Sequence, residues 1–236
     1  SREMSFVRAI SAAGVMYVVT RNCSEGAFLN CGCDDSKTGE IDREGWTWGG
    51  CSDNVKFGEK ISKQFIDGIE AGRDAQSVLN LHNNDAGRKA VRSTLERRCK
   101  CHGVSGSCTL QTCWTQLTDF SNIGRSLRKK YFTATRIEGQ EIDLIAEGSD
   151  VTEVEDPTDG GFSITPLAKR GLVYLEESPD YCSVNETLGL SGTVGRECIK
   201  KNAINTKLCE DEEVGWLKYV SNQIKPGIHS YECGCG

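Results

Sequence analysis

The alternation of hydrophobic and polar residues predicts helices in the first half of the chain. Apolar side chains recur at helical spacing in four segments, residues 1–20, 57–69, 78–95 and 119–130. Their apolar faces consist of Phe6, Ile10, Ala13 and Tyr17 in the first; Phe57, Ile61, Phe65 and Ile69 in the second; Val78, Leu79, His82, Ala86, Val91 and Leu95 in the third; and Phe120, Ile123 and Leu127 in the fourth. We therefore expect a mainly α-helical domain over residues 1–135.

Polar and turn-forming residues indicate where the middle helices begin and end. Ser52 and Asp53 are suitable N-caps for the second helix and Asp74 for the third, because their side-chain oxygens accept hydrogen bonds from free backbone amides. Gly72 is the expected stop between these two helices.

After residue 135 the helical pattern gives way to two weaker regions. Residues 138–159 are acidic and contain no lysine or arginine, so we expect residues 136–170 to form a flexible acidic linker. Residues 171–236 form a short cysteine-bearing tail, in which the apolar run 172–175 predicts a short strand.

The cysteine content changes the picture of how the chain is stabilised. Aromatic residues make up only 7% of the sequence, whereas it contains 13 cysteines, grouped within residues 23–51, 99–113 and 182–235. Such density is typical of an oxidising compartment. Each bridge that closes a short loop contributes about 2–4 kcal/mol. Disulfides are thus expected to supplement a lean hydrophobic core.

The charge distribution narrows the classes of partner. A net charge of −6 argues against nucleic acid as a partner. The basic segment 88–100 is interpreted as a solvated helix face, with a heparan sulfate contact as the minority alternative. No apolar stretch is long enough to span a bilayer. The first residues show no charged-then-apolar leader, so we expect any signal peptide to have been removed or to lie upstream.

The segment from Cys99 to Cys113 carries the most specific motif of the chain. Pairing Cys101 with Cys108 and Cys99 with Cys113 makes a nested, doubly bridged hairpin. The residues at its tip are His102, Gly103, Val104, Ser105, Gly106 and Ser107. Glycines on both sides of Ser105 permit a tight turn and leave its hydroxyl unobstructed. Such a serine suits a modifying enzyme, and such a protrusion suits receptor binding.

Three other interpretations of this motif compete with this one. Ser105 is compatible with an ordinary turn serine. A hydrolase nucleophile elbow is disfavoured, because Ser107 stands where the second glycine is required and cysteines flank the turn. Zinc binding by the cysteines and His102 is a minority view, since the spacing differs from the usual zinc-ligand pattern. No catalytic residue and no metal site are therefore expected.

Four motifs resemble those of the Wnt family of secreted, lipid-modified signalling proteins, in the family's order. They are Trp46-Thr-Trp-Gly-Gly-Cys-Ser-Asp-Asn54, Leu79-Asn-Leu-His-Asn-Asn-Asp-Ala-Gly-Arg-Lys89, Cys99-Lys-Cys-His-Gly-Val-Ser-Gly-Ser-Cys108 and Ser178-Pro-Asp-Tyr-Cys182. The sequences Asn22-Cys-Ser and Gly195-Arg-Glu-Cys198 are most similar to those of subfamily eight. The resemblance covers about residues 1–198.

The resemblance implies a saposin-like helical bundle with a protruding hairpin and a palmitoleoyl ester on Ser105. In the family, this acyl chain fills a groove in the cysteine-rich domain of Frizzled receptors. Other implied partners are a co-receptor related to the LDL receptor, a membrane-bound O-acyltransferase and the Wntless carrier. The implied role is developmental cell–cell signalling from the extracellular space and matrix. The chain is then a ligand and not an enzyme, without cofactors beyond palmitoleate and N-glycans.

The resemblance also suggests specific covalent modifications. The implied disulfides are Cys23–Cys31, Cys33–Cys51, Cys99–Cys113 and Cys101–Cys108, with Cys198–Cys209 as a weaker suggestion. Two sequons, at Asn22 and Asn185, match glycosylated positions of the family.

The last part of the sequence departs from the family pattern. The double cysteine expected after Cys209 is replaced by acidic residues, and Cys182 is expected to lose its usual partner. A truncated Wnt antagonist and a disulfide-stapled structural protein without an acyl group therefore remain as alternatives.

Overall fold

The computed structural model describes residues 1–70, 74–137, 145 and 171–192, and the backbone of residues 197–199, 218–219 and 230–234. The chain divides into two compact units, Ser1–Glu177 and Ser178–Gly236. Most of the expected acidic linker lies outside the described residues, as do Gly72 and Cys209.

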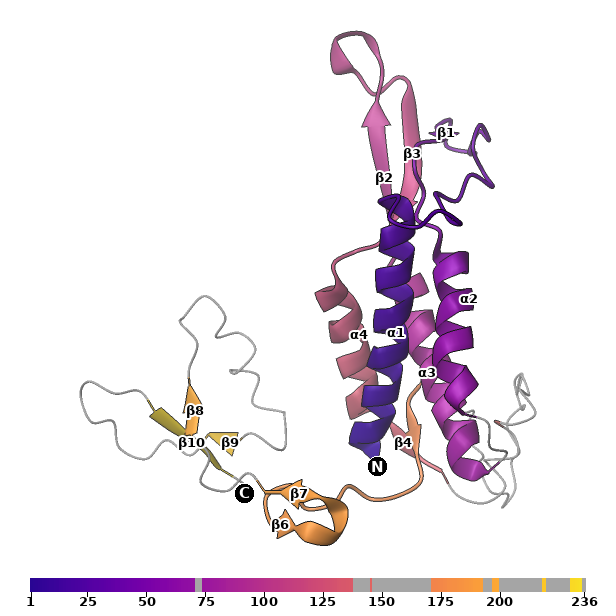
Figure 1. Cartoon of the computed structure of the whole chain (residues 1–236). Coiled ribbons are helices and arrows are strands. Elements are labelled where there is room, and N and C mark those ends of the chain that lie inside the picture. Colours follow the sequence, from indigo (N-terminus) through magenta and orange to yellow (C-terminus); the bar gives the residue numbers. More distant parts are fainter. Residues whose placement is uncertain are drawn as a thin grey trace, which may run out of the picture. The chain divides into compact units, whose positions relative to one another are not determined.

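The first unit is built around one central helix. Helix α1 (Arg2–Ser24) packs against α2 (Val55–Ile66), α3 (Ala75–Ser93) and α4 (Phe120–Phe132), as Figure 1 shows. A short 3-10 helix, η1 (Asp67–Ile69), follows α2. The four helices confirm the helical domain expected from the hydrophobic pattern.

Small residues bring the helices unusually close together. Ala9, Ala12 and Ala13 of α1 are fully buried. A Cβ atom on Gly87 of α3 would lie 2.0 Å from the carbonyl oxygen of Ala9, so only glycine fits at this contact. A Cβ atom on Gly58 of α2 would lie 2.7 Å from the carbonyl oxygen of Met16. The backbone of α1 thus touches two neighbouring helices directly.

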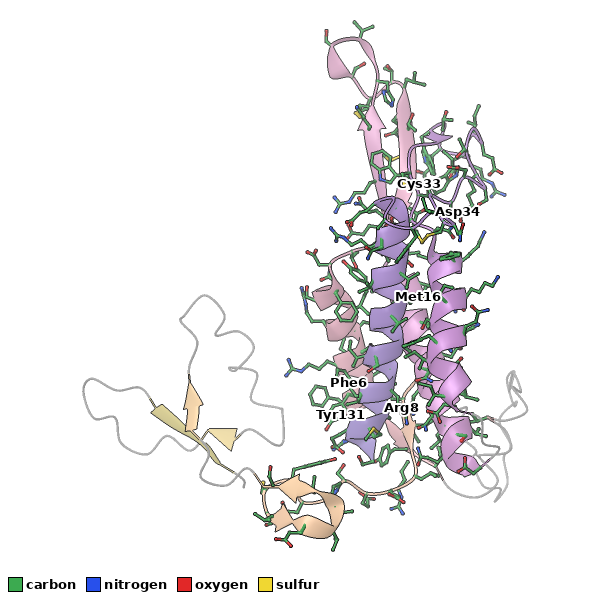
Figure 2. The ribbon with its side chains drawn as sticks, in the orientation of Figure 1. Phe6, Arg8, Met16, Cys33, Asp34 and Tyr131 are labelled. Atoms are coloured by element: carbon green, nitrogen blue, oxygen red, sulfur yellow. A yellow bond between two sulfur atoms is a disulfide. The ribbon has the colours of Figure 1, made fainter. Side chains whose placement is uncertain are left out.

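Aromatic side chains fill the opposite side of α1, towards α4. The rings of Phe6 and Tyr131 meet edge to face with centroids 6.0 Å apart (Figure 2). Tyr17 and Phe120 are 5.2 Å apart. Ile123 and Leu127 of α4 are fully buried beside them.

The expected apolar face of the second helix is wrong in its last turns. Phe65 is 64% exposed and Ile69 is 71% exposed. The packing face of α2 carries Gly58 and Ser62 instead, and the Ser62 hydroxyl donates to the carbonyl of Ala12 at 2.9 Å. Close approach to α1 requires small side chains, which a search for large apolar residues overlooks.

The capping prediction is confirmed for α3 and corrected for α2. Asp74 accepts a hydrogen bond from the amide of Ser77 at 3.0 Å. The N-cap of α2 is Asn54, whose side chain accepts from Phe57 N at 3.1 Å. Ser52 and Asp53 instead bond to the β3 region, described below.

Basic residues after position 87 are largely paired, which corrects the expectation of a solvated helix face. Arg88 is only 2% exposed and binds both carboxylate oxygens of Asp67, at 3.0 and 2.9 Å. The exposed pairs Arg97–Glu44 and Arg98–Glu96 lie at 3.1 and 2.8 Å. Helix α3 ends at Ser93, because the chain then enters a strand.

A three-stranded sheet lies at the end of the bundle opposite the N-terminus, and two of its strands form a hairpin (Figure 1). Strand β2 (Glu96–Cys101) pairs antiparallel with β3 (Gln111–Gln116), and β1 (Thr47–Trp48) pairs parallel with the other edge of β3. The hairpin itself extends beyond the helices.

Residues 171–177 are part of the first unit. Strand β5 (Val173–Tyr174) pairs parallel with β4 (Thr135–Arg136), which confirms the strand expected at residues 172–175. Buried Asn83 of α3 donates to Val173 O at 2.9 Å and accepts from Val173 N at 3.0 Å. The compact unit consequently runs to Glu177, beyond the boundary expected at residue 135.

His82 lies beside the segment that leads into β5. Its Nε2 is 3.0 Å from the carbonyl oxygen of Gly171, and burial lowers the pKa of its imidazole. His82 is a packing residue of the α3–β5 contact.

The described part of the second unit contains short strands and the 3-10 helix η3 (Glu186–Leu188). Strands β6 (Val184–Asn185) and β7 (Leu190–Ser191) flank η3. Strands β8 (Glu197–Ile199), β9 (Lys218–Tyr219) and β10 (Ser230–Gly234) form a sheet of order β8-β10-β9. Cys182 is disulfide-bonded. No helix of the described residues is long and apolar enough to cross a membrane.

Candidate functional site: a doubly bridged hairpin

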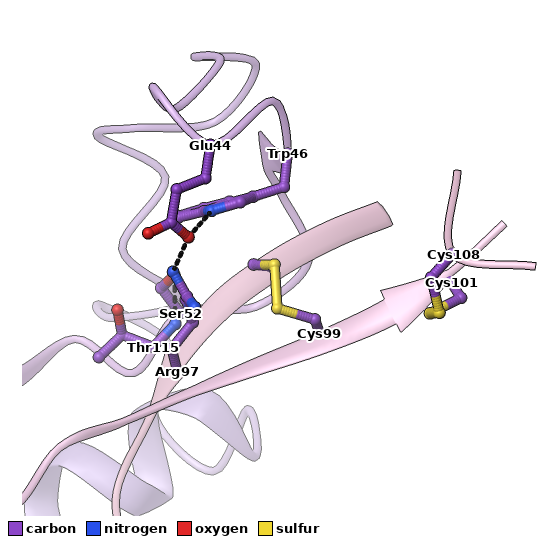
Figure 3. Close-up of a disulfide and its surroundings, with 9 residues drawn as sticks. Glu44, Trp46, Ser52, Arg97, Cys99, Cys101, Cys108 and Thr115 are labelled. Carbon is purple, nitrogen blue, oxygen red and sulfur yellow. Dashed lines mark hydrogen bonds and ion pairs between the residues drawn. A yellow bond between two sulfur atoms is a disulfide. The ribbon is translucent and has the colours of Figure 1, made fainter. Parts of the chain in front are cut away.

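Two disulfides lock the strands of the hairpin, as the cysteine spacing predicts. Cys99 lies directly opposite Cys113 in the ladder, and their Cα atoms are 4.0 Å apart. Cys101 and Cys108 close the loop nearer the tip, with Cα atoms 4.6 Å apart. Both bridges are seen in Figure 3, where β2 and β3 run side by side. Because all four sulfurs are in disulfides, the hairpin offers no thiolate to zinc.

Backbone hydrogen bonds define the tip above the second bridge. His102 N donates to Leu110 O at 2.7 Å, which extends the ladder by one pair. Gly103 N donates to Ser107 O at 2.8 Å, and Gly106 N donates to Gly103 O at 2.9 Å. Residues Val104–Gly106 thus form the short 3-10 turn η2.

The tip holds Ser105 in a left-handed conformation. Ser105 has φ 56° and ψ 27°, and it has the one positive φ of a non-glycine residue in the described chain. Such a conformation costs about 1–3 kcal/mol and persists only where the surroundings enforce it. Gly106 also has a positive φ of 77°. A Cβ atom on Gly103 would lie 2.0 Å from Ser107 Oγ, so a side chain at that position does not fit.

The side chains around Ser105 are exposed and partly apolar. All residues from Val104 to Leu110 are exposed. Val104 is 90% exposed and Leu110 57%. The tip therefore presents a hydroxyl between apolar neighbours to an approaching protein.

A cysteine-bridged loop supports the base of the hairpin. Disulfides Cys23–Cys31 and Cys33–Cys51 join the same pairs that the family resemblance implies. Trp46 is 2% exposed, and the Arg97 guanidinium lies 5.0 Å from its ring centroid. Glu44 accepts from Arg97 and from the Trp46 indole, as drawn in Figure 3. The tryptophan motif thus holds this loop against β2.

Asp53 ties the hairpin to the central helix. One carboxylate oxygen accepts from the Ser24 hydroxyl at the end of α1, and the other accepts from Leu117 N at 2.6 Å. Asp53 N donates to Thr115 O at 2.8 Å. The sequence pattern indicated only a helix cap at this position. The position of Asp53 next to Cys51, itself in a bridge, was the signal for a role in the loop.

Comparison with known proteins gives the family. The model described as "wnt family" matches residues 1–211. The chain belongs to the Wnt family. The expected similarity to subfamily eight is confirmed as well. Protein Wnt-8b of Mus musculus is 55% identical over 201 residues, which cover 85% of this chain and 55% of that protein. Protein Wnt-8a of Homo sapiens is 52% identical over 217 residues, covering 92% of this chain and 60% of that protein.

A solved Wnt structure has the same fold. The structure "Human WLS in complex with WNT8A" matches with a TM-score of 0.61 and 48% sequence identity, covering 87% of this chain and 62% of that chain. This chain therefore spans little more than half the length of the curated Wnt relatives named above.

The two sequons of this Wnt chain lie in different surroundings. Asn22 is in the last turn of α1, and its amide donates to Val18 O at 2.8 Å. Asn185 is exposed and caps η3, and its side-chain oxygen accepts from Thr187 N and from the Thr187 hydroxyl, at 3.1 and 2.6 Å. Of the two, Asn185 is more accessible in the folded chain, and glycosylation at both positions stays a prediction.

Proposed function

We propose that this chain is a secreted Wnt-8-type ligand whose Ser105 carries a palmitoleoyl ester for binding to a Frizzled cysteine-rich domain. The observation that supports the proposal most strongly is the geometry of the tip. Ser105 is held in a left-handed turn, flanked by Gly103 and Gly106, at the exposed end of a doubly bridged hairpin.

The physical role of the acyl chain is to supply apolar contact area. Each methylene that is buried in a receptor groove contributes about 0.8 kcal/mol. A single chain of this kind anchors a protein to a membrane only marginally, so it remains transferable to a protein groove. The two disulfides order the tip before binding, which lowers the entropic cost of association.

The family and the fold support a ligand in place of an enzyme. Catalysis by a serine requires a base within hydrogen-bond reach of its hydroxyl. The one possible base at the tip is His102, and among the described residues no hydrogen bond joins its imidazole to the Ser105 hydroxyl. We therefore assign Ser105 the role of an acyl acceptor, with no cofactor needed by the chain.

The carrier is the partner best supported by comparison. The matching human structure is a complex of WNT8A with WLS, and this chain shares 48% identity with the aligned part. We propose that a Wntless protein carries this chain during secretion and that a membrane-bound O-acyltransferase modifies Ser105 beforehand. Binding to a co-receptor related to the LDL receptor and retention in the matrix belong to the same proposal.

Heparan sulfate is a weaker part of the proposal. The basic segment first considered for it is engaged elsewhere, because Arg88 is buried against Asp67 and Arg97 is paired with Glu44. Helix α4 contains Arg125, Arg128, Lys129 and Lys130 without any acidic residue, so it is the better candidate for a sulfated glycan.

A mass measurement tests the proposal directly. The secreted protein is digested without reducing agent, and the peptide spanning Cys99 to Cys113 is weighed. We expect two internal disulfides and one monounsaturated 16-carbon acyl group. Ser105→Ala should lack the acyl group and lose binding to a purified Frizzled cysteine-rich domain, whereas Ser107→Ala serves as the matched control. A bare Ser105 in the secreted protein would instead favour the structural-protein alternative.

A further inference from the structure

The central helix α1 carries a stripe of uncharged side chains that point away from the three helices packed around it. Helices α4 and α2 flank α1, and α3 contacts it from behind (Figure 1). The outward positions follow one another at intervals of three or four residues, so they share one side of the helix. This outer stripe consists of Met4, Val7, Ser11, Val15 and Val18. Met4 and Val7 are each 49% exposed, and Val18 is 56% exposed.

The outer stripe differs from the exposed faces of the neighbouring helices. Single exposed apolar side chains are common on protein surfaces, but a continuous row of them is not. The exposed residues of α2 and α4 include five cations, Lys56, Lys60, Lys63, Arg125 and Lys129. Between Glu3 and Arg21, α1 has one charged residue, Arg8, and its guanidinium is paired with Glu70. An uncharged stripe about 21 Å long is typical of a helix that packs against another protein surface.

The outer stripe has the same spacing when it is read from either end. Its intervals are three, four, four and three residues, with Ser11 at the centre. If a second copy of α1 lies antiparallel across it, Met4 lies at the height of Val18 of the second copy. Val7 then lies at the height of the second copy's Val15. Ser11 meets Ser11 of the second copy on a twofold axis, where small side chains let the two helices approach closely.

Charges at the two ends of the outer stripe favour the antiparallel arrangement. Glu3 and Arg21 are 18 residues apart, which is five full turns, so they lie on the same flank of α1. Antiparallel pairing brings Glu3 of each copy near Arg21 of the other, whereas parallel pairing places like charges side by side. Both side chains already have partners within the chain, Tyr131 and Glu25. The new pairs therefore select the orientation and add little affinity.

We propose that this chain associates with a second copy of itself through α1, as a symmetric antiparallel dimer with Ser11 at the twofold axis. The inference does not depend on acylation of Ser105. The outer stripe is narrow, so the contact buries less than the roughly 800 Å² per partner of a standard interface. We therefore expect a weak dimer that dissociates on dilution.

The antiparallel arrangement keeps both hairpins available for binding. The hairpin lies beyond the C-terminal end of α1 (Figure 1), so two antiparallel copies of α1 direct their hairpins away from each other. One dimer thus presents two Ser105 tips at opposite ends, and each tip can bind a separate partner.

Cysteine crosslinking tests the position of the twofold axis. Ser105→Ala serves as the background, so that acyl chains do not drive association. Ser11→Cys should form a disulfide between two chains on mild oxidation, because residue 11 faces its own copy. Gln64→Cys is the control: Gln64 is exposed and lies two residues after Ser62, which bonds to α1, so it points away from the dimer contact. We expect at least about tenfold less crosslinking in this control, measured by mass spectrometry of the unreduced digest.

The same chemistry tests the orientation of the two helices. Val18→Cys alone should not link two chains, because the two copies of residue 18 lie at opposite ends of an antiparallel pair. An equal mixture of Met4→Cys and Val18→Cys should link residue 4 of one chain to residue 18 of the other. Strong linking of Val18→Cys to itself would indicate parallel helices and overturn the proposed arrangement.

Sedimentation equilibrium measures the association without any added cysteine. In the Ser105→Ala background, the average mass should rise with protein concentration. Val18→Glu places a carboxylate against Met4 of the second copy, so we expect the dissociation constant to rise at least about tenfold. Gln64→Glu adds the same charge on the far side of α2 and should leave the dissociation constant unchanged. The mass of a single chain at every concentration, or equal association of both variants, would overturn the inference and leave the proposed receptor binding intact.

Discussion

The hairpin and the helical bundle reach a fixed structure by different physical means. In the bundle, order comes from close contact of small residues, such as Gly87 against the backbone of Ala9. In the hairpin tip, the side chains from Val104 to Leu110 are exposed, and order comes from the Cys101–Cys108 bridge and a tight turn. A covalent staple lets a segment protrude into solvent and still keep one shape, which packing alone does not allow.

The strongest way to break the bundle is to fill its closest contact. Gly87→Ala places a methyl group 2.0 Å from the carbonyl oxygen of Ala9. We expect a loss of about 3 kcal/mol or more in the free energy of unfolding, because backbone must move. Gly124→Ala in α4, where a Cβ meets nothing within 4 Å, is the control. Chemical denaturation followed by circular dichroism measures both, and equal stabilities would refute the close-contact argument.

Within the basic segment, buried and exposed arginines should differ in how much they contribute to the free energy of unfolding. Arg88→Met removes both charge-assisted hydrogen bonds to Asp67 and leaves its carboxylate bonded to the Asn84 amide alone, so we expect a loss of about 3 kcal/mol. Arg98→Met removes an exposed pair with Glu96 and should change stability by less than about 1 kcal/mol. Urea unfolding of the two variants provides the measurement. A small effect at Arg88 would contradict its structural role.

Removing the outer staple should affect the tip and spare the bundle. In Cys101→Ser/Cys108→Ser, the tip loses a constraint worth about 2–3 kcal/mol locally, whereas α1 and its neighbours keep all their contacts. We expect thermal unfolding at 222 nm to shift by only a few degrees, while acylation and Frizzled binding fall sharply. Cys33→Ser/Cys51→Ser removes a bridge of the supporting loop and is the comparison. Unchanged acylation in Cys101→Ser/Cys108→Ser would show that the turn keeps its conformation without the disulfide.

The smallest expected effect is a pH dependence at the contact between α3 and β5. Burial lowers the pKa of His82 below its usual value of 6.5. The unfolded chain then binds the proton more readily, so stability is complete above pH 6.5 and falls as the pH drops through the lowered pKa. His82→Gln should flatten this part of the profile. Melting temperatures between pH 5 and 8 test the point.

The two regions also differ in what their sequence reveals. The positions of the cysteines and glycines between residues 99 and 113 predicted the nested hairpin, because these constraints are local. The helices were predicted as elements, but not their packing. The face of α2 was misassigned, since Gly58 and Ser62 carry no hydrophobic signal. The hydrogen bonds between Asn83 and Val173 join residues 90 positions apart, and no local pattern contains such a contact.

Direct backbone contacts at Gly58 and Gly87 position α1 along its two neighbouring helices. The last turn of α1 holds Asp53 through Ser24, and Asp53 holds the end of β3 through Leu117. The position of α1 along its neighbours therefore determines how far the hairpin projects from the bundle, and with it the distance of Ser105 from the helices.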